Sequence, residues 1–215
     1  ALLLEGIHPG AREVLAAEGI SVTLLPGSPP KEELAALVAQ HDIVGLRSKT
    51  QLTGDIIRGA PHLLAIGAFC IGTNQIDLAA TKRHGVAVFN APYSNTRSVV
   101  ELAIAEIISL ARRLHEKSTA MHNGVWNKSA AGSHEVRGRT LGIVGYGNIG
   151  SQLSVVAEAL GLSVVFYDID DKLALGNARK CATLEELLAT ADVVSLHVDG
   201  RPGNAGLCGD EQMSQ

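Results

Sequence analysis

The sequence predicts an α/β protein with two doubly wound parallel sheets. Short apolar runs alternate with helical patterns through residues 1–94, which is typical of a parallel sheet with helices on its faces. A long helical pattern follows, and beyond it a glycine-rich loop lies between a strand pattern and a second helical pattern. We therefore expect one unit at residues 1–94 and a second at 95–215, which begins with the long helix.

In the first unit, each short apolar run indicates a buried strand and each run with helical spacing indicates a helix. Pro9 suits the first turn of a helix, whereas the cluster Pro26–Pro30 interrupts the pattern before the next one. The expected strands are 2–4, 22–25, 43–46, 63–66 and 86–89, and the expected helices are 9–18 and 31–39. Polar residues follow the strand at 43–46, and ligands of open α/β sheets bind at such strand ends.

The second unit is expected to begin with one continuous helix from Ser98 to about Ala120. Its apolar face comprises Val99, Leu102, Ile104, Ile107, Ile108 and Leu114. A face this apolar predicts a packed helix and not a solvated linker. Strands are expected at 140–144, 163–167 and 193–198, with a helix at 151–160. Because a doubly wound nucleotide domain commonly has about six strands, these three predict an incomplete Rossmann domain.

Gly145, Gly147 and Gly150 form a G-x-G-x-x-G loop between the strand at 140–144 and the helix after it. In a dinucleotide site the first glycine permits a tight turn, the second lets the backbone approach the pyrophosphate, and the third lets helix and strand pack closely. The helix start adds unpaired N–H groups and the positive end of the helix dipole. The spacing alone is a weak signal in a chain with 23 glycines, but its position between strand and helix predicts a dinucleotide site.

Asp168 ends the next strand, about twenty residues after the loop, where an acid is expected to meet the adenosine ribose. Its carboxylate can accept hydrogen bonds from both ribose hydroxyls and would repel a 2′-phosphate. Neither Ile169 nor Asp170 is an arginine. The sequence therefore favours NAD over NADP as the cofactor.

Composition argues against several classes of function. The chain has 46% hydrophobic and 19% charged residues, as a globular protein does, and its net charge of −4 argues against general nucleic-acid binding. We found no run long enough to span a membrane and no signal-peptide pattern, so we expect a cytoplasmic protein. Cys70, Cys181 and Cys208 are widely spaced, which predicts reduced thiols without a metal site.

The order of the motifs is informative as a whole. A small α/β unit is followed by Asn90-Ala91-Pro92, a long helix, a Gly-x-Trp segment at 124–126 and the glycine loop. This order resembles the D-isomer-specific 2-hydroxyacid dehydrogenase family. The segments 45–50, 69–77, 89–98 and 124–128 narrow the resemblance to family members that oxidise D-3-phosphoglycerate.

The resemblance implies NAD-dependent oxidation of D-3-phosphoglycerate to 3-phosphohydroxypyruvate, the first committed step of serine biosynthesis. It implies a flavodoxin-like substrate domain at 1–94, a Rossmann NAD domain at 95–215, and a homotetramer. In the family a serine-sensing regulatory domain follows, and this sequence has no counterpart of it. One alternative is a dehydrogenase for another D-2-hydroxy acid, and another is a non-catalytic NAD-binding interaction protein.

The resemblance also implies site residues. The implied substrate contacts are Arg47, Ser48, Lys49, Asn95 and Lys128, and Lys128 would reach the site of a neighbouring subunit. The implied cofactor contacts are Gly145, Gly147, Asn148, Ile149, Gly150 and Asp168. Trp126 would anchor a subunit contact. A solvated surface position for the two lysines, and burial of Trp126 in the chain's own core, are the alternatives.

By the same resemblance, the catalytic arginine, glutamate and histidine come from segments that would follow Gln215. We therefore expect no catalytic residue within this chain, which would be an inactive fragment of a longer protein. His197 lies near a strand end, but its place does not match the family's catalytic histidine. We expect it to pack or to line the cofactor pocket.

Overall fold

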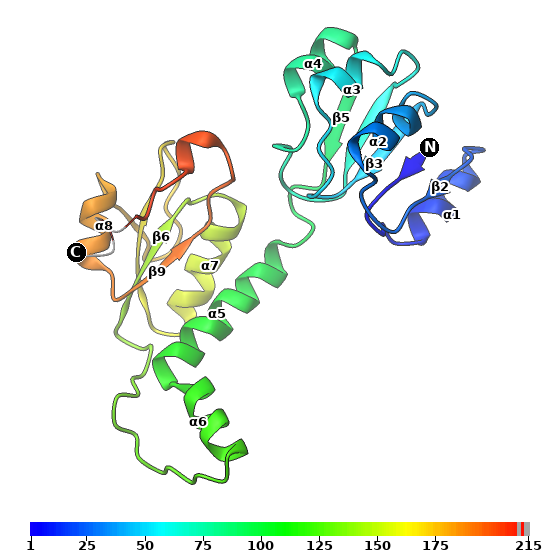
Figure 1. Ribbon diagram of the computed structural model, residues 1–215. Helices are drawn as coiled ribbons and strands as arrows, with labels where there is room; N and C mark the ends of the chain where they lie inside the picture. Colours follow the sequence, from blue (N-terminus) through cyan, green and yellow to red (C-terminus); the bar gives the residue numbers. More distant parts are fainter. Residues whose placement is uncertain (210–211, 213–215) are drawn as a thin grey trace. The chain divides into compact units, whose positions relative to one another are not determined.

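The chain divides into two compact units, Ala1–Asn95 and Thr96–Gln215, and each contains one sheet in which all strands are parallel (Figure 1). The computed structural model describes residues 1–209 and 212. Within these residues, we find no helix that has both the length and the apolar character needed to cross a membrane. The α/β fold class expected from the sequence is confirmed.

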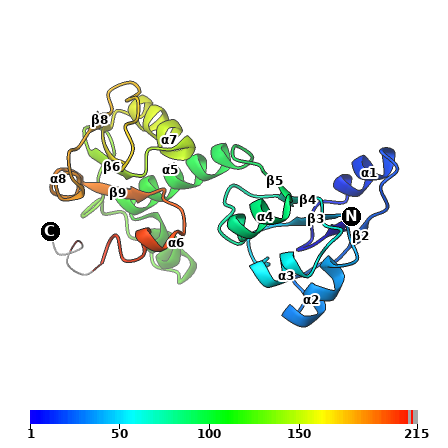
Figure 2. The same cartoon turned by 90° about the horizontal axis from the view of Figure 1, so that it is seen from above.

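The first sheet has five strands in the order β2-β1-β3-β4-β5, which is the strand order of flavodoxin-like folds. The strands are β1 (Leu2–Leu3), β2 (Thr23–Leu24), β3 (Ile43–Leu46), β4 (Ala65–Ala68) and β5 (Ala87–Asn90). The helices are α1 (Gly10–Ala17), α2 (Lys31–Val38), α3 (Gly54–Arg58) and α4 (Leu78–His84). Figure 2 shows α1 on one side of this sheet and α2 and α3 on the other.

One face of the first sheet carries the main core of this unit. Alternate residues of the central strands, including Val44, Leu46 and Ile66, pack in one cluster with Leu34 of α2 and Ile57 of α3. All five are buried. Since successive strand residues point to opposite faces, this packing fixes which face of each central strand turns toward α2 and α3.

Two helices in this unit were not expected, and the bounds of every strand except β3 differ from the expected ones by one or two residues. Helix α3 has five residues, which is too short to show a helical repeat. Helix α4 has recognisable caps that were overlooked, because Asp77 accepts a hydrogen bond from the Ala80 N–H and Gly85 has a φ of +70°. Strand β4 begins at Ala65 and not at 63, because Leu63 closes a turn by donating to the carbonyl of Ala60 (3.1 Å).

The second sheet has four strands in the order β8-β7-β6-β9, which is the order of one half of a doubly wound nucleotide domain plus the first strand of the other. The strands are β6 (Thr140–Val144), β7 (Ser163–Tyr167), β8 (Arg179–Lys180) and β9 (Val193–Leu196). The sheet therefore has one strand more than the three segments from which strands were expected. Strand β8 has two residues, both exposed and basic, so it has no apolar pattern.

Helices cover both faces of the second sheet. Leu141, Ile143 and Phe166 pack in one cluster with residues of α5 (Thr96–Arg112) and α7 (Asn148–Ala159). Val144 and Val165 point to the other face and pack with α8 (Leu184–Thr190). Helix α7 begins at Asn148 and not at 151, so the last glycine of the loop lies in its first turn.

The long helix expected from 98 to about 120 is broken into α5 and α6 (Leu114–His122). Arg113, between them, has a left-handed φ of +54°. Its guanidinium contacts Glu116 and donates to the carbonyl of Ala131 (3.2 Å), so the segment after α6 folds back onto the break. Figure 1 shows α6 and this segment extending beyond the end of α5, away from the second sheet.

The apolar face of α5 also differs in part from the expected one. Val100 and Ile107 are the buried apolar residues of the helix, and Ile104 packs beside them. Leu102, which was expected on this face, is 61% exposed. The register of the buried stripe is therefore set by contact with α7 and not by every apolar residue in the helix.

Candidate functional site

The glycine loop joins β6 to α7, and its three glycines have different surroundings. Gly145 has a φ of +92°, and a Cβ there would lie 2.5 Å from the carbonyl oxygen of His197. A Cβ on Gly150 would clash with the carbonyl oxygen of Gly145. A Cβ on Gly147 would meet no atom within 4 Å. The fold itself thus requires glycine at two positions, whereas at Gly147 the absent side chain leaves open space at the start of α7.

Tyr146, inside the loop, is buried and holds the loop to the core. Its ring stacks on Phe166 with centroids 3.8 Å apart. Its hydroxyl lies 2.6 Å from the hydroxyl of Ser154 on α7 and accepts a hydrogen bond from the Leu175 N–H (3.2 Å). The side chain therefore positions the loop and is not available to a ligand.

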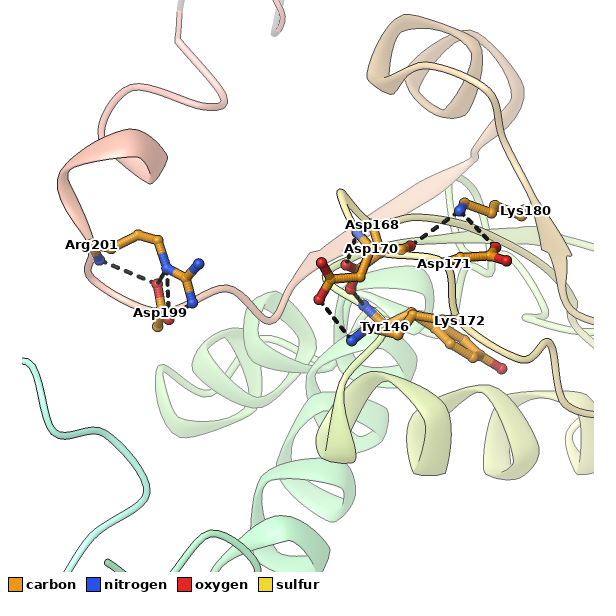
Figure 3. Close-up of polar contacts among 8 residues, drawn as sticks. All are labelled: Tyr146, Asp168, Asp170, Asp171, Lys172, Lys180, Asp199 and Arg201. Atoms are coloured by element: carbon orange, nitrogen blue, oxygen red, sulfur yellow. Dashed lines mark hydrogen bonds and ion pairs between the residues drawn. The ribbon is translucent and has the colours of Figure 1, made fainter. Parts of the chain in front are cut away.

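Asp168 directly follows β7 and contacts the glycine loop through its carboxylate. Oδ2 accepts the backbone N–H of Tyr146 (2.7 Å), and Oδ1 accepts the backbone N–H of Asp170 (2.9 Å), as Figure 3 shows. A carboxylate has about four acceptor positions, so acceptor capacity remains for a ligand. Asp168 thus fixes the turn and also faces the space beside it.

A pocket of about 210 Å³ opens at the carboxyl ends of β6, β7 and β9. Its lining includes Gly145, Gly147, Asp168, Lys172, His197 and Arg201. Ligands of doubly wound sheets bind at this edge. The open space at Gly147, the N–H groups at the start of α7 and the carboxylate at the end of β7 fit a dinucleotide.

Asn148 and Ile149, which were expected to contact the cofactor, begin α7. Neither lines the pocket beside Asp168. The side chain of Ile149 is half-buried and packs against the core that α5 and α7 share. Only its backbone at the helix start can serve the expected contact.

His197 follows β9 and lines the same pocket. This is one of the two positions expected from the sequence, the other being a packed position. Its Nε2 lies 2.9 Å from the hydroxyl of Ser195, and its backbone N–H donates to the carbonyl of Val144 (2.8 Å). Burial lowers the pKa of His197 below its ordinary value. Burial therefore favours the neutral form of the imidazole in this pocket.

Two cations in this pocket were missed in the sequence. Lys172 pairs with Asp170 (3.0 Å), and Arg201 pairs with both carboxylate oxygens of Asp199 (Figure 3). The hydrogen bond from Lys172 lowers the pKa of Asp170, and that from Arg201 lowers the pKa of Asp199. The prediction of NAD over NADP rested on Asp168 and the two residues after it, whereas the loop after β9 also lines the pocket.

The expected substrate residues Arg47, Ser48 and Lys49 lie together in the loop after β3, and all three side chains are exposed. The carboxylate of Glu5, at the end of β1, accepts the backbone N–H groups of Arg47 (3.1 Å), Lys49 (3.0 Å) and Thr50 (2.9 Å). Burial alone would raise the pKa of Glu5, but these N–H groups outweigh it and lower that pKa. The backbone of the loop is therefore fixed while its cationic side chains face solvent.

Gln75 holds the same loop from the segment between β4 and α4. It is buried, and its amide donates to the carbonyls of Arg47 (2.8 Å) and Gly72 (3.2 Å). Sequence reasoning missed both Glu5 and Gln75. Glu5 could have been found, because it is an acid at the carboxyl end of a parallel strand, but nothing in the sequence pairs it with a loop more than 40 residues away.

The structure places the other expected binding residues separately. Asn95 is exposed after β5, at the end of the first unit. Lys128 and Trp126 lie in the segment after α6 and line a groove of about 290 Å³ with Leu114 and Met121. Trp126 is 74% exposed, so the alternative of burial in the chain's own core is wrong.

The cysteines were expected to be reduced thiols. Cys70, Cys181 and Cys208 are free thiols, and burial raises the pKa of Cys181. Within residues 1–209 and 212 no group of three or more histidine, cysteine, aspartate or glutamate side chains could hold a metal ion.

The strand order and the glycine loop define a Rossmann-like α/β protein. The chain matches the family described as "D-isomer specific 2-hydroxyacid dehydrogenase, catalytic domain" over residues 1–199. It belongs to this family, as the order of its motifs predicted.

Individual relatives are more specific. The chain is 51% identical over 215 residues to D-3-phosphoglycerate dehydrogenase of Haemophilus influenzae, covering 100% of this chain and 52% of that protein. Its structure is similar to the TT0316 protein from Thermus thermophilus, with a TM-score of 0.89 and 27% identity over 99% of this chain and 68% of that one.

A D-lactate dehydrogenase from Aquifex aeolicus, solved with NAD and lactic acid, has a TM-score of 0.85 and 24% identity over 100% of this chain and 65% of that one. This second structural similarity shows the fold. The chain spans about half the length of the curated relatives it matches.

Proposed function

We propose that this chain is part of an NAD-dependent D-3-phosphoglycerate dehydrogenase, which oxidises D-3-phosphoglycerate to 3-phosphohydroxypyruvate in the first step of serine biosynthesis. The observation that carries the proposal is the 51% identity along the whole chain to an enzyme of that name. The pocket of the second unit and the cationic loop of the first supply physical support, because the reaction needs a dinucleotide and a doubly anionic acid.

In this proposal the second unit binds NAD through the backbone of Gly145, Gly147, Asn148, Ile149 and Gly150 and the carboxylate of Asp168. The N–H groups at the start of α7 bind the pyrophosphate, which approaches through the open space at Gly147. The remaining acceptor positions of Asp168 bind ribose hydroxyls. When bound, NAD accepts the hydride that leaves C2 of the substrate.

The first unit binds the substrate anion in this proposal, through Arg47, Ser48, Lys49 and Asn95, with Lys128 contributed by a neighbouring subunit. The guanidinium of Arg47 suits a carboxylate or a phosphate, and Glu5 and Gln75 hold its loop in place. Oxidation at C2 also releases a hydroxyl proton. Charged arginine and lysine have no acceptor for a proton, so this loop binds the substrate without completing the reaction.

Turnover by the protein that contains this chain tests the proposal. We expect kcat/KM with NAD to be at least about tenfold higher for D-3-phosphoglycerate than for D-glycerate or D-lactate, because one charged hydrogen bond to the phosphate corresponds to about that factor or more. Preference for an unphosphorylated acid would instead support a dehydrogenase for another D-2-hydroxy acid. Binding of NAD without turnover of any of the three would support the non-catalytic alternative.

The 215-residue chain by itself is a second arm of this experiment. We expect it to bind NADH, seen as a change in nicotinamide fluorescence, and to show no reduction of NAD by D-3-phosphoglycerate. Measurable NADH production would contradict the assignment of proton transfer to residues outside this sequence.

We further propose a homotetramer, with Trp126 at a subunit contact, and a cytoplasmic location. Trp126 is 74% exposed, and Leu114 and Met121 of α6 and the neighbouring Val125 are at least 50% exposed. Large exposed apolar side chains that cluster on a surface are typical of protein interfaces.

Replacing Trp126 with alanine is expected to weaken self-association by about thirtyfold or more, because tryptophans central to interfaces commonly contribute about 2 kcal/mol or more. Sedimentation velocity over a range of concentrations measures this change. Val14→Ala is the matched control, since Val14 is 68% exposed on α1 and its loss should leave association unchanged. Equal dissociation constants for both variants would remove Trp126 from the contact.

A further inference from the structure

Three carboxylates and two cationic side chains line the pocket that we propose binds the dinucleotide. Lys172 donates to Asp170 (3.0 Å), and Arg201 donates to both oxygens of Asp199 (2.7 and 3.0 Å from Nε). The third carboxylate, Asp168, accepts two backbone N–H groups. Each cation is therefore already paired with a carboxylate, and carboxylates outnumber cations in the wall beside the expected ribose position.

The two ion pairs differ in how firmly they are held. Arg201 is bonded to Asp199 through its side chain and its backbone N–H, and Asp199 also accepts from Asn204, so this pair is part of the loop structure. Lys172 makes a single hydrogen bond to a carboxylate that is 68% exposed. Exposed pairs of this kind stabilise a fold little, so one substitution at Asp170 can release Lys172 without disturbing the pocket wall.

Lys172 lies where it can act on a ligand at the ribose position. It lines the same pocket as Asp168 and Gly147. Its pKa is raised by the hydrogen bond and the charge of Asp170 and, to a smaller extent, by the charge of Asp168. An ammonium group with three donors is a suitable partner for a phosphate once its own carboxylate is removed.

We propose that Asp170 is a specificity-determining residue, which by pairing with Lys172 prevents an ammonium group at the edge of the ribose pocket from binding a 2′-phosphate. Rejection of NADP then depends on Asp170 as well as on Asp168. This inference rests on the proposed function, because it assumes that the pocket binds the adenosine ribose of a dinucleotide.

Asp171 provides a matched control for the test. It precedes Lys172 directly and pairs with Lys180 (3.2 Å), but its side chain is fully exposed and does not line the pocket. Asp171→Asn therefore removes the same charge next to the site without releasing Lys172. Asp170→Asn combined with Lys172→Met tests whether the released ammonium group is the cause of any gain.

The experiment is titration of the 215-residue chain with NADH and NADPH, followed by nicotinamide fluorescence. We expect Asp170→Asn to tighten NADPH binding about tenfold, since one repulsive charge is lost and one attractive charge becomes available at short range, and to change NADH binding by less than about threefold. The double variant should lose most of the gain, and Asp171→Asn should show none.

The outcomes separate this inference from the proposed function. Wild-type chain that binds no NADH would overturn the proposed cofactor, and the inference with it. Binding of NADH together with equal NADPH affinity in the wild type, Asp170→Asn and Asp171→Asn chains would overturn the inference alone. A gain that persists in the double variant would also overturn it, because Lys172 would then have no part in phosphate binding.

Discussion

Replacing Gly147 with alanine is expected to leave the chain folded while it weakens NADH binding by about ten- to a hundredfold, the equivalent of one charged hydrogen bond. Gly147 has a φ of −84°, which alanine adopts, and a Cβ there would meet no atom of the chain within 4 Å. The added methyl group would instead occupy the space through which, as we propose, the pyrophosphate reaches the N–H groups at the start of α7. Nicotinamide fluorescence and thermal unfolding together measure the two effects.

Gly150→Ala is the comparison variant, because it is expected to lower stability where Gly147→Ala is not. Its Cβ would clash with the backbone carbonyl of Gly145, which cannot move aside as the end of a flexible side chain could. We expect a loss of about 1–3 kcal/mol in the free energy of unfolding, as overpacked positions commonly show. If Gly147→Ala lowered stability as much as Gly150→Ala, or left NADH affinity unchanged, the assignment of Gly147 to the pyrophosphate would be wrong.

Replacing Glu5 with glutamine is expected to lower the free energy of unfolding near neutral pH by about 1–3 kcal/mol, the range for hydrogen bonds to a charged acceptor. Glu5 accepts three backbone N–H groups of the loop after β3. An amide keeps one acceptor oxygen and places an NH₂ group where the other oxygen was, facing N–H donors. Urea unfolding measures the change, and Glu13→Gln on α1, where the side chain is exposed, is the control.

The same substitution should change how stability depends on pH. The loop N–H groups lower the pKa of Glu5 below its ordinary value of 4.5, so the unfolded chain binds the proton more readily. The stabilisation is therefore fully present above the ordinary pKa and is lost as the pH falls through the lower folded pKa. Glu5→Gln should show a shallower loss below pH 4.5 than the wild type, and parallel curves would indicate that Glu5 does not hold the loop.

Glu5 also has a backbone conformation that is unusual for its type. Its φ is +59°, and that of Gly6 is +62°. This backbone conformation costs a non-glycine residue about 1–3 kcal/mol, and it persists only where other contacts offset that cost. Here the hydrogen bonds of its carboxylate supply those contacts, which couples the strained turn after β1 to the loop that carries Arg47.

The parts of the fold that followed from the sequence are those with a strong local pattern. The strands at 140–144 and 163–167 have the expected bounds, because both are continuous apolar runs that are buried on two faces. Strand β8 and helix α3 have no such run and were missed. The break at Arg113 could not be read from the helix itself, since its hydrogen-bond partner, Ala131, comes much later in the chain.

The candidate site follows the same rule. The glycine loop and Asp168 could be predicted as cofactor contacts because their spacing is local and has a known physical reason. Lys172 and Arg201 were missed because the pocket is assembled from the ends of separate strands, and spacing along the chain does not show which loops meet. Glu5 and Gln75 act through backbone groups of a distant loop, and backbone groups leave no mark in the sequence.

Under the proposed function, Asp168 would link the choice of cofactor to the integrity of the glycine loop. The carboxylate expected to read the ribose also accepts the N–H of Tyr146, within the glycine turn. A lineage that changed its coenzyme by losing this acid would also lose the hydrogen bond that holds the glycine turn. Adaptation toward another coenzyme is therefore easier through neighbouring positions that bear charge without supporting the turn.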